Sequence, residues 1–363
     1  MMNNTYKCIY CLEDKPEAKF NTEHVISRML GTYENAFVLN HCEVCQDCNS
    51  SFCNDLESVA SLDSYEGLLR LQHIRAKHES KGRYIGRKRL RFTGQNGVFK
   101  GLTFYVSTNP DNPGGIQIEA APTIGIIREG SINEYDYYEI SDIPEHDDTM
   151  QLRLSQAETP IITFGYTESE VSSAFANKGY DLSRMKYSGG LQVSDVTSDT
   201  EINMNIVAKV DELLERLAAK NLFNFLCYTY GREFVLDKRL ENLRSFIRYG
   251  KQSGGVQQSI YRGGLVGFPG KSENGHIIGT FWTATDSLYL GGFVSWFGAI
   301  TYSFLIEKWS PDDKFIDTHY AICDNQSRTI CSKKQLLTAE WPNSDYSITV
   351  TDKAVIMIPK KQK

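Results

Sequence analysis

Apolar residues recur at every third or fourth position in two neighbouring segments of the chain, which is the spacing of an amphipathic α-helix. The first segment runs from Ile206 to Phe225 and is followed by Gly231, a residue type that commonly ends helices. The second segment runs from Leu236 to Tyr249. The pattern therefore predicts a pair of helices near the middle of the chain.

Strand-like patterns occupy most of the chain on either side of this helical pair. Segments rich in β-branched and aromatic residues, bounded by Gly, Pro and Asn, precede it, and similar segments resume at Ser259. One short helix is expected among them, because Thr167 and Glu170 form a capping box and Gly179 provides an end after about Lys178. The region after the first 80 residues is therefore expected to be β-rich with a central helical pair.

The segment from Ser287 to Ile306 carries no charge, and an uncharged run of this length is a candidate membrane helix. Glycine, serine and threonine dilute its hydrophobicity, while aromatic and β-branched residues alternate as they do in buried strands. We therefore expect strands here and no membrane span. The sequence also shows no signal peptide, which favours a cytoplasmic protein.

Cysteines are concentrated near the start of the chain, where two Cys-x-x-Cys pairs occur, Cys8/Cys11 and Cys45/Cys48. Four thiolates in two such pairs can close a tetrahedral zinc site that has no open position. The predicted Zn²⁺ is therefore structural, and its binding adds folding free energy to a short segment with little core of its own.

Two further cysteines, Cys42 and Cys53, leave alternatives open. Six neighbouring cysteines can in principle form disulfides, although the x-x spacing suits chelation better and nothing indicates secretion. Cys42/Cys45 also has the spacing of a zinc pair, so Cys42 competes with Cys48 as the fourth ligand.

Candidate catalytic groups lie between and beside the cysteine pairs. The sequence Glu23-His24-Val25-Ile26 lies between them, and Asn49 follows the second pair directly. Phosphodiester hydrolysis needs a base for the attacking water and a hard cation for the phosphate and the leaving oxygen. Glu23, His24 and Asn49 together offer an imidazole base and the oxygen ligands that Mg²⁺ prefers.

This layout resembles the HNH endonuclease family, whose motif lies on a strand, a strand and a helix packed around a metal ion. The resemblance implies that Glu23 and Asn49 hold a catalytic Mg²⁺ or Mn²⁺ and that His24 is the general base. It also implies that Asn40 braces the loop that carries His24. It favours Cys48 over Cys42 as the zinc ligand, because Asn49 then follows at once.

Two features of this chain depart from the family pattern. Ser27 stands where many relatives carry Pro, and no basic residue follows Asn49. On the same predicted helix, Asp55 and Glu57 are additional candidates for the metal shell, although a solvated helix carboxylate is the more ordinary expectation for both.

Charge is unevenly distributed along the chain. The net charge of −6 does not favour broad non-specific DNA binding, which depends on neutralising phosphates. A basic run between residues 70 and 91 nevertheless offers candidate nucleic-acid contacts, with Phe92 as a stacking residue and a solvated strand face as the alternative. The candidates are Arg83, Arg87, Lys88, Arg89 and Arg91. The acidic tract from Glu134 to Asp148 is expected to be a solvated loop.

The sequence as a whole predicts an α+β protein with an N-terminal zinc-knuckle ββα-metal module. The expected divisions are a module at 1–80, a β-rich domain at 81–202, a helical segment at 203–252 and a C-terminal β-rich segment at 253–363, the last forming one domain with 81–252. Apolar residues make up 41% of the chain and charged residues 23%, as in soluble globular proteins.

The expected function is a metal-dependent HNH endonuclease that nicks DNA, in the setting of anti-phage defence or restriction. One module has one active site, so a double-strand break would need a homodimer or two separate events. A defence-system partner protein is the other expected association. The alternative function is a zinc-dependent DNA-binding or assembly protein that does not cut.

Overall fold

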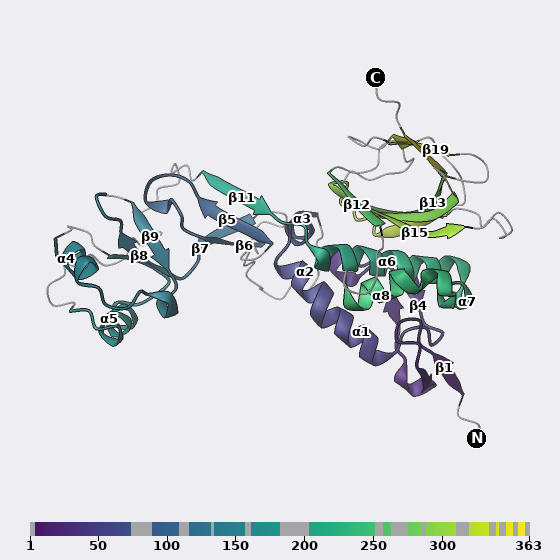
Figure 1. Cartoon of the computed structure of the whole chain (residues 1–363), viewed down its shortest axis with the longest axis horizontal. Coiled ribbons are helices and arrows are strands. Elements are labelled where there is room, and N and C mark those ends of the chain that lie inside the picture. Colours follow the sequence, from purple (N-terminus) through teal and green to yellow (C-terminus); the bar gives the residue numbers. More distant parts are fainter. Residues whose placement is uncertain are drawn as a thin grey trace. The chain divides into compact units, whose positions relative to one another are not determined.

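The structure is a computed structural model that describes residues 4–73, 89–108, 116–131, 134–156, 161–181, 203–250, 257–262, 275–284, 288–309, 319–333, 339–340, 346–350 and 355–359. The chain forms two compact units, a first unit of residues 1–77 and 210–363 and an inserted unit of residues 78–209. Helices and strands are mixed, with a larger β-rich region after the N-terminal segment (Figure 1). This grouping differs from the divisions expected from the sequence, whose boundaries stay predictions.

The N-terminal segment of the first unit follows the order strand, strand, helix. Strand β3 pairs antiparallel with β4, so that Glu23 lies opposite Leu39 and His24 opposite Val38, and helix α1 follows. The elements are β1 Thr5–Lys7, β2 Asp14–Pro16, a 3₁₀ turn Glu17–Lys19, β3 Glu23–His24, a 3₁₀ turn Arg28–Leu30, β4 Val38–Leu39, α1 Gln46–Phe52, a π-helical turn Cys53–Glu57, α2 Ser58–Leu62 and α3 Tyr65–His73.

Helix α6, Glu212–Tyr230, begins later than the apolar spacing indicates. The carboxylate of Asp211 caps it by accepting a hydrogen bond from the backbone N–H of Leu213 at 3.1 Å, and Gly231 ends it with a φ of 90°. Residues 204–208 instead form strand β11, in which Ile206 is 49% exposed. The predicted start at Ile206 is therefore wrong, because its apolar side chain belongs to an exposed strand face.

The second helix begins later than predicted at Leu236. A 3₁₀ turn, Lys238–Leu240, precedes α8 Glu241–Tyr249, and a separate short helix, α7 Arg232–Leu236, lies before that turn. The side chain of Asp237 caps the 3₁₀ turn by accepting from the N–H of Arg239 at 2.9 Å, which interrupts the helix. Arg244 of α8 is only 2% exposed and donates to the carbonyl of Val235. It is therefore part of the core and no candidate for nucleic-acid contact.

The C-terminal strands form one sheet, in the order β12-β15-β14-β13-β20-β19-β18, to which β16 and β17 are added beside β13. The β13–β20 pair is parallel, and the other pairs are antiparallel. The strands are β12 Gln257–Arg262, β13 His276–Ala284, β14 Leu288–Trp296, β15 Ile300–Trp309, β16 Tyr320–Asp324, β17 Thr329–Lys333, β18 Ala339–Glu340, β19 Tyr346–Val350 and β20 Val355–Pro359.

The uncharged run near residue 300 forms strands β14 and β15, as its alternation predicted. Across the described part of the chain, every helix is too short or too polar to span a membrane.

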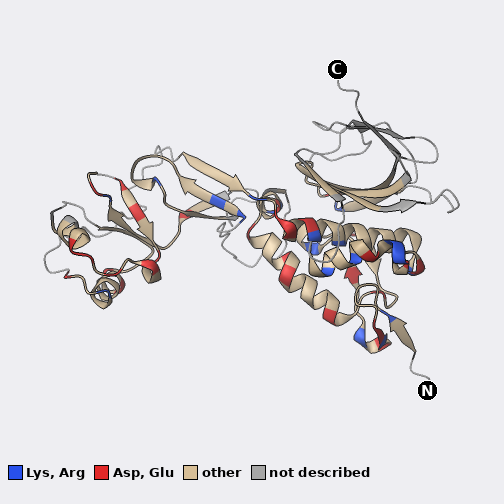
Figure 2. Cartoon of the chain, in the orientation of Figure 1, with Lys and Arg blue, Asp and Glu red and all other residues tan. Residues whose placement is uncertain are grey.

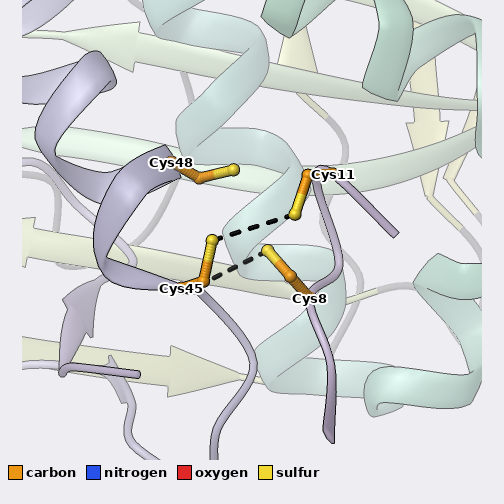
Figure 3. Close-up of side chains that lie close together, drawn as sticks. All are labelled: Cys8, Cys11, Cys45 and Cys48. Carbon is orange, nitrogen blue, oxygen red and sulfur yellow. Dashed lines mark hydrogen bonds between the residues drawn. The ribbon is translucent and has the colours of Figure 1, made fainter. Parts of the chain in front are cut away.

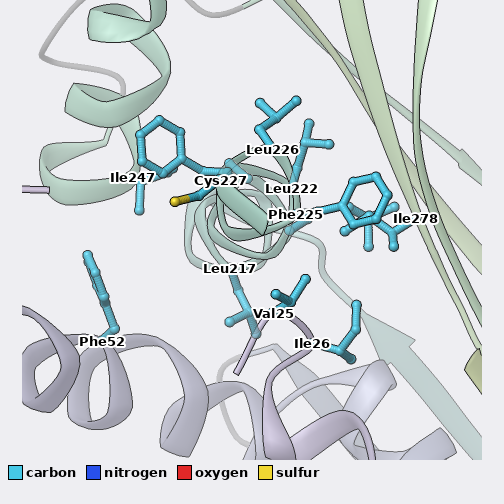
Figure 4. Packing of buried hydrophobic residues seen from close by; sticks show 14 of the residues in the cluster. Val25, Ile26, Phe52, Leu217, Leu222, Phe225, Leu226, Cys227, Ile247 and Ile278 are labelled. Atoms are coloured by element: carbon cyan, nitrogen blue, oxygen red, sulfur yellow. The ribbon is translucent and has the colours of Figure 1, made fainter. Parts of the chain in front are cut away.

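Helix α6 lies at the centre of the first unit and shares its core with both neighbours. Figure 4 shows Leu222 and Phe225 on the side that faces Ile278 of the sheet, and Leu217 on the side that faces Val25. The close approach to the sheet depends on Gly292 of β14, because a Cβ there would lie 2.5 Å from the methyl carbons of Leu222. The N-terminal segment therefore packs on a helix that lies far along the sequence.

Polar contacts also attach the N-terminal segment to the sheet. The ring of His276 on β13 is fully buried, with Nε2 2.7 Å from the carbonyl oxygen of Leu30, and Nδ1 accepts from the N–H of Phe297 at 3.2 Å. These partners assign the proton to Nε2. Asn35 adds two hydrogen bonds of 2.7 Å to the backbone of Ile330. The neutral imidazole of His276 is thus a structural bridge.

Acid is expected to destabilise the first unit through His276. Burial lowers the pKa of His276 from 6.5 to about 4, so below pH 6.5 the unfolded chain takes up a proton that the folded chain excludes. Stability is complete above pH 6.5 and falls as the pH approaches 4, by about 3 kcal/mol in total at about 1.4 kcal/mol per pKa unit. Urea unfolding at pH 7 and pH 4.5 measures the difference.

The control for this prediction is a pair of variants. His276→Gln should flatten the dependence of unfolding free energy on pH, whereas His41→Gln, at an exposed position of the N-terminal segment, should leave it unchanged. Equal slopes in the wild type and in His276→Gln would show that other groups cause the acid sensitivity.

The inserted unit has its own hydrophobic cluster, which includes Ile124, Leu154 and Phe175. Among its described residues, the strands pair in the orders β10-β8-β9, β11-β5 and β6-β7. The elements are β5 Leu90–Gly94, a 3₁₀ turn Gly97–Phe99, β6 Phe104–Thr108, β7 Ile116–Ala120, β8 Thr123–Ile127, β9 Tyr135–Tyr138, a 3₁₀ turn Ile140–Asp142, α4 Asp148–Gln156, β10 Ile161–Phe164, α5 Glu168–Asn177 and β11 Met204–Ala208.

The inserted unit also contains the predicted capping box and the acidic tract. The capping box is confirmed, because Thr167 accepts from the N–H of Glu170 and the Glu170 carboxylate accepts from the N–H of Thr167 at the start of α5. The acidic tract, expected to be a loop, contains strand β9 and the first residue of α4. Arg128 explains the strand, since it pairs with both Glu134 and Asp136 and so neutralises part of the acidic charge.

Candidate functional site

Four cysteine side chains converge where the loop after β1 meets the start of α1. Figure 3 shows their sulfur atoms pointing toward one another. The four Sγ atoms lie within 4.8 Å of one another, and those of Cys11 and Cys45 are 3.8 Å apart. A tetrahedral zinc site with Zn–S bonds of about 2.3 Å requires S···S distances of about 3.8 Å. The cluster of Cys8, Cys11, Cys45 and Cys48 therefore fits Zn²⁺.

The thiol pKa values indicate why this cluster needs a cation. The hydrogen bond between Cys8 and Cys48 lowers the pKa of the Cys8 thiol to about 4 and raises that of Cys48. Burial raises the pKa of Cys11 to about 11. Four thiolates close together repel one another, and a bound metal ion would supply the positive charge that stabilises them.

The structure shows that Cys48, and not Cys42, belongs to the four-cysteine cluster. Cys42 lies in the loop before α1 with a φ of 63° and is outside the cluster, whereas Cys48 is on α1 and within it. All nine cysteines are free thiols, so none of them forms a disulfide. Within the residues that the structure describes, these four cysteines are the one group of His, Cys, Asp or Glu side chains close enough together to hold a metal ion.

His24 lies on β3, opposite Val38 of β4. Its side chain is half-buried, and burial, followed by the positive charge of Arg28, lowers its pKa below 6.5. The imidazole is therefore neutral at pH 7 and able to accept a proton. The backbone directly after His24 is held by a hydrogen bond in which the Val25 N–H donates to the Phe37 carbonyl at 2.9 Å.

Asn49 reaches the residues that lead into β3. From the first turns of α1, its amide nitrogen donates to Asn21 Oδ1 at 3.0 Å and to the carbonyl of Thr22 at 3.3 Å. The structure thus places Asn49 against the start of the strand that carries His24. Asn40 is exposed directly after β4, and its bracing role stays a prediction.

The Glu23 carboxylate is turned into the protein, where it meets two side chains of α6. Glu23 is 4% exposed, and its Oε1 is hydrogen bonded to the Lys220 ammonium and, at 3.1 Å, to the amide of Asn224. As the chain is folded, Oε1 of Glu23 already has a cationic partner, so these donors do not fit a Mg²⁺ bound through that oxygen. The expectation that Glu23 binds Mg²⁺ therefore stays a prediction.

Glu57 joins this buried group because of the π-helical turn between α1 and α2. Such a turn shifts the following side chains out of α-helical register and often occurs at functional sites. Glu57 Oε1 lies 2.7 Å from Lys220 Nζ and accepts from Ser27 Oγ at 2.8 Å. The carboxylate is therefore not the solvated helix residue that was the ordinary expectation, and its partner is an ammonium group.

Only two of the five candidate nucleic-acid-binding residues, Arg89 and Arg91, lie in the described part of the chain. Arg83, Arg87 and Lys88 lie outside the described residues. Arg89 is partly buried and Arg91 is exposed on β5, whereas Phe92 is 3% exposed and so cannot stack on a base. On helices α6 to α8, Lys and Arg alternate with Asp and Glu (Figure 2), so these helices present mixed charge. Nucleic-acid binding by the basic run thus stays a prediction.

Helix α6 supplies Lys220, Asn221 and Asn224 to the site, a contribution that the sequence did not predict. All three are fully buried. The sequence could have indicated these residues, because a lysine and two asparagines lie inside an apolar helical pattern. Polar side chains on a buried helix need polar partners.

Comparison with known proteins identifies the N-terminal segment. Residues 8–62 match the sequence model of a family described as HNH endonuclease. No curated protein and no solved structure matches the chain. The match covers the cysteine cluster, β3, β4 and α1, and it leaves α6 and the C-terminal sheet outside.

Proposed function

We propose, from the HNH endonuclease module that residues 8–62 form, that this protein hydrolyses phosphodiester bonds of nucleic acid. The observation that carries the proposal is the placement of His24. It lies on a strand that is paired with a second strand, and Asn49 of the following helix contacts the two residues that lead into that strand. The same module carries a four-cysteine cluster suited to zinc. Neutral, half-buried imidazole in this setting can act as a general base.

In the proposed reaction, His24 accepts a proton from the attacking water, and the products carry a 5′ phosphate and a 3′ hydroxyl. A divalent cation, Mg²⁺ or Mn²⁺, would supply stabilisation of the charge on the phosphate and the leaving oxygen. Asn49 is the predicted ligand whose contacts are compatible with this role. The four-cysteine cluster would bind a structural zinc ion, because four protein ligands leave no open position for water or substrate.

DNA is the proposed substrate, and each module would nick one strand. A double-strand break would then need two copies of the chain or two events. Anti-phage defence or restriction remains the proposed setting, and it rests on the size of the chain beyond the module, because an indiscriminate nuclease endangers its own cell. The cytoplasmic location and a defence-system partner belong to this proposal.

Metal-dependent nicking is the expected result of incubating the full chain with supercoiled plasmid. Relaxed circles should form with Mg²⁺ or Mn²⁺, should be resealed by DNA ligase because the ends are 5′ phosphates, and should not form with EDTA. An RNA of similar mass in parallel reactions decides the substrate class. Intact plasmid under every condition, with zinc still bound, would contradict the proposal.

The alternative is a zinc-dependent protein that binds DNA without cutting it. The observation that favours it is the engagement of Glu23 by Lys220, which occupies a carboxylate expected to bind the catalytic metal. Under this alternative the protein retains plasmid in a mobility-shift assay equally with Mg²⁺ and with EDTA, and it makes no breaks.

A further inference from the structure

We infer that Lys220 and Asn224 of helix α6 are positioning residues for His24, and that Glu23 is the anchor between them rather than a metal ligand. This inference rests on the proposed function, because it concerns the geometry of the proposed general base. It assigns part of the nuclease site to a helix outside the matched residues 8–62.

The first contact is the ion pair of Lys220. Its ammonium is fully buried and lies between the carboxylates of Glu23 and Glu57, with Nζ 2.7 Å from Glu57 Oε1. Burial lowers the pKa of Lys220, but the two carboxylates outweigh this effect and raise it overall, so the lysine is charged. A buried charge of this kind is costly to leave unpaired. The carboxylate of Glu23 is therefore held toward α6.

The second contact reaches the backbone of His24 itself. The Asn224 amide nitrogen donates to Glu23 Oε1 and to the carbonyl oxygen of His24, each at 3.1 Å. The other end of the same amide is fixed, because Asn224 Oδ1 accepts from the Tyr10 hydroxyl at 2.7 Å. One side chain thus connects the zinc knuckle, the anchor and the proposed base.

The third contact joins α6 to Ser27, which lies three residues after His24. Asn221 Oδ1 accepts from the backbone N–H of Ser27 at 3.3 Å, and Ser27 Oγ lies 2.8 Å from both Asn221 Oδ1 and Glu57 Oε1. Positions 220, 221 and 224 lie within about one turn of α6. Residues 23 to 27 are therefore held from end to end by one short stretch of helix, which limits the movement of His24.

A metal-ligand role for Oε1 of Glu23 would require this arrangement to open. That oxygen would have to leave Lys220 and Asn224, so that the ammonium kept only Glu57 and the amide kept only the His24 carbonyl. Buried polar groups that lose a partner carry the full desolvation penalty. The anchor role needs no such movement, since every contact it uses is already made.

The decisive experiment uses the double variant Glu23→Leu/Lys220→Met in the full chain. It removes the Glu23 carboxylate and its buried counter-charge together, and Glu57, whose side chain is 19% exposed, keeps the hydrogen bond from Ser27 Oγ. Mn²⁺ binding, followed by the electron paramagnetic resonance signal of the free ion, should stay within about threefold of wild type, whereas Asn49→Ala should weaken it at least about tenfold. Loss of Mn²⁺ binding in the double variant, with zinc retained, would overturn the inference.

Nicking rates provide the second readout. Lys220→Met and Glu23→Leu alone should each lower kcat at least about tenfold with little change in KM, because both side chains are buried and out of reach of DNA. Lys220→Arg and the double variant should recover part of the loss. Lys238→Met, at an exposed position of the first unit, is the matched control and should cut like wild type. A double variant no better than Glu23→Leu would contradict the anchor role.

Amide hydrogen exchange keeps the test independent of activity. Asn224→Leu should speed exchange of the Val25 N–H and its neighbours at least about tenfold while leaving the sheet unaffected. Unchanged exchange there would refute positioning by Asn224. If the wild type neither cuts nor binds Mn²⁺, the proposed function fails, and exchange still decides whether α6 holds the strand of His24.

Discussion

Cys48→Ser is expected to remove zinc from the protein and to unfold the N-terminal segment. The variant leaves three thiols in place of four, and a hydroxyl is a poor zinc ligand. Structural zinc contributes on the order of 10–16 kcal/mol of apparent binding free energy in small zinc domains, which is comparable to the whole stability of a typical domain, about 5–15 kcal/mol. Atomic emission should find no stoichiometric zinc, and far-ultraviolet circular dichroism should show lost structure.

Cys42→Ser is the matched control, because Cys42 is close in sequence but outside the cluster. It should retain one zinc ion per chain and the melting temperature of the wild type. The reverse outcome, with zinc lost in Cys42→Ser and kept in Cys48→Ser, would mean that the other pairing of cysteines forms the site.

His24→Ala is expected to lower the nicking rate by about 10²–10⁴-fold, the usual contribution of a general base. The half-buried ring is not part of the hydrophobic core, so zinc content and melting temperature should change little. The rate constants come from time courses of relaxed-circle formation at saturating Mg²⁺.

His41→Ala provides the comparison for that rate. His41 is exposed in the same segment, just after β4, and has no proposed role in the reaction. It should cut within about twofold of wild type. Equal losses in both variants would point to a general effect on the segment, and no loss in His24→Ala would exclude His24 as the base.

The local features of the site could be predicted from the sequence because they are determined by spacing. Two Cys-x-x-Cys pairs predict a four-cysteine cluster in which Cys42 and Cys48 compete for the fourth position, and the structure brings the sulfur of Cys48 to the other three. The capping box at Thr167 and the end of α6 at Gly231 are likewise set by neighbouring residues. These predictions required no knowledge of tertiary contacts.

The partners of Glu23 could not be predicted, because the contact joins residues 23 and 220 through the packing of α6 on β3. A carboxylate before a histidine is compatible with either a metal ion or an ammonium, and only the fold decides between them. The same limit explains the misplaced start of α6. Ile206 has the spacing of a helix, but pairing of β11 with β5 places it on a strand.

The measurement that tests the account most directly is a plasmid-nicking assay of wild type beside His24→Ala, at equal zinc content, each with Mg²⁺ and with EDTA. The account predicts relaxed circles only for the wild type with Mg²⁺. Relaxed circles from both proteins, or from neither, would contradict the claim that this module is a nuclease whose base is His24.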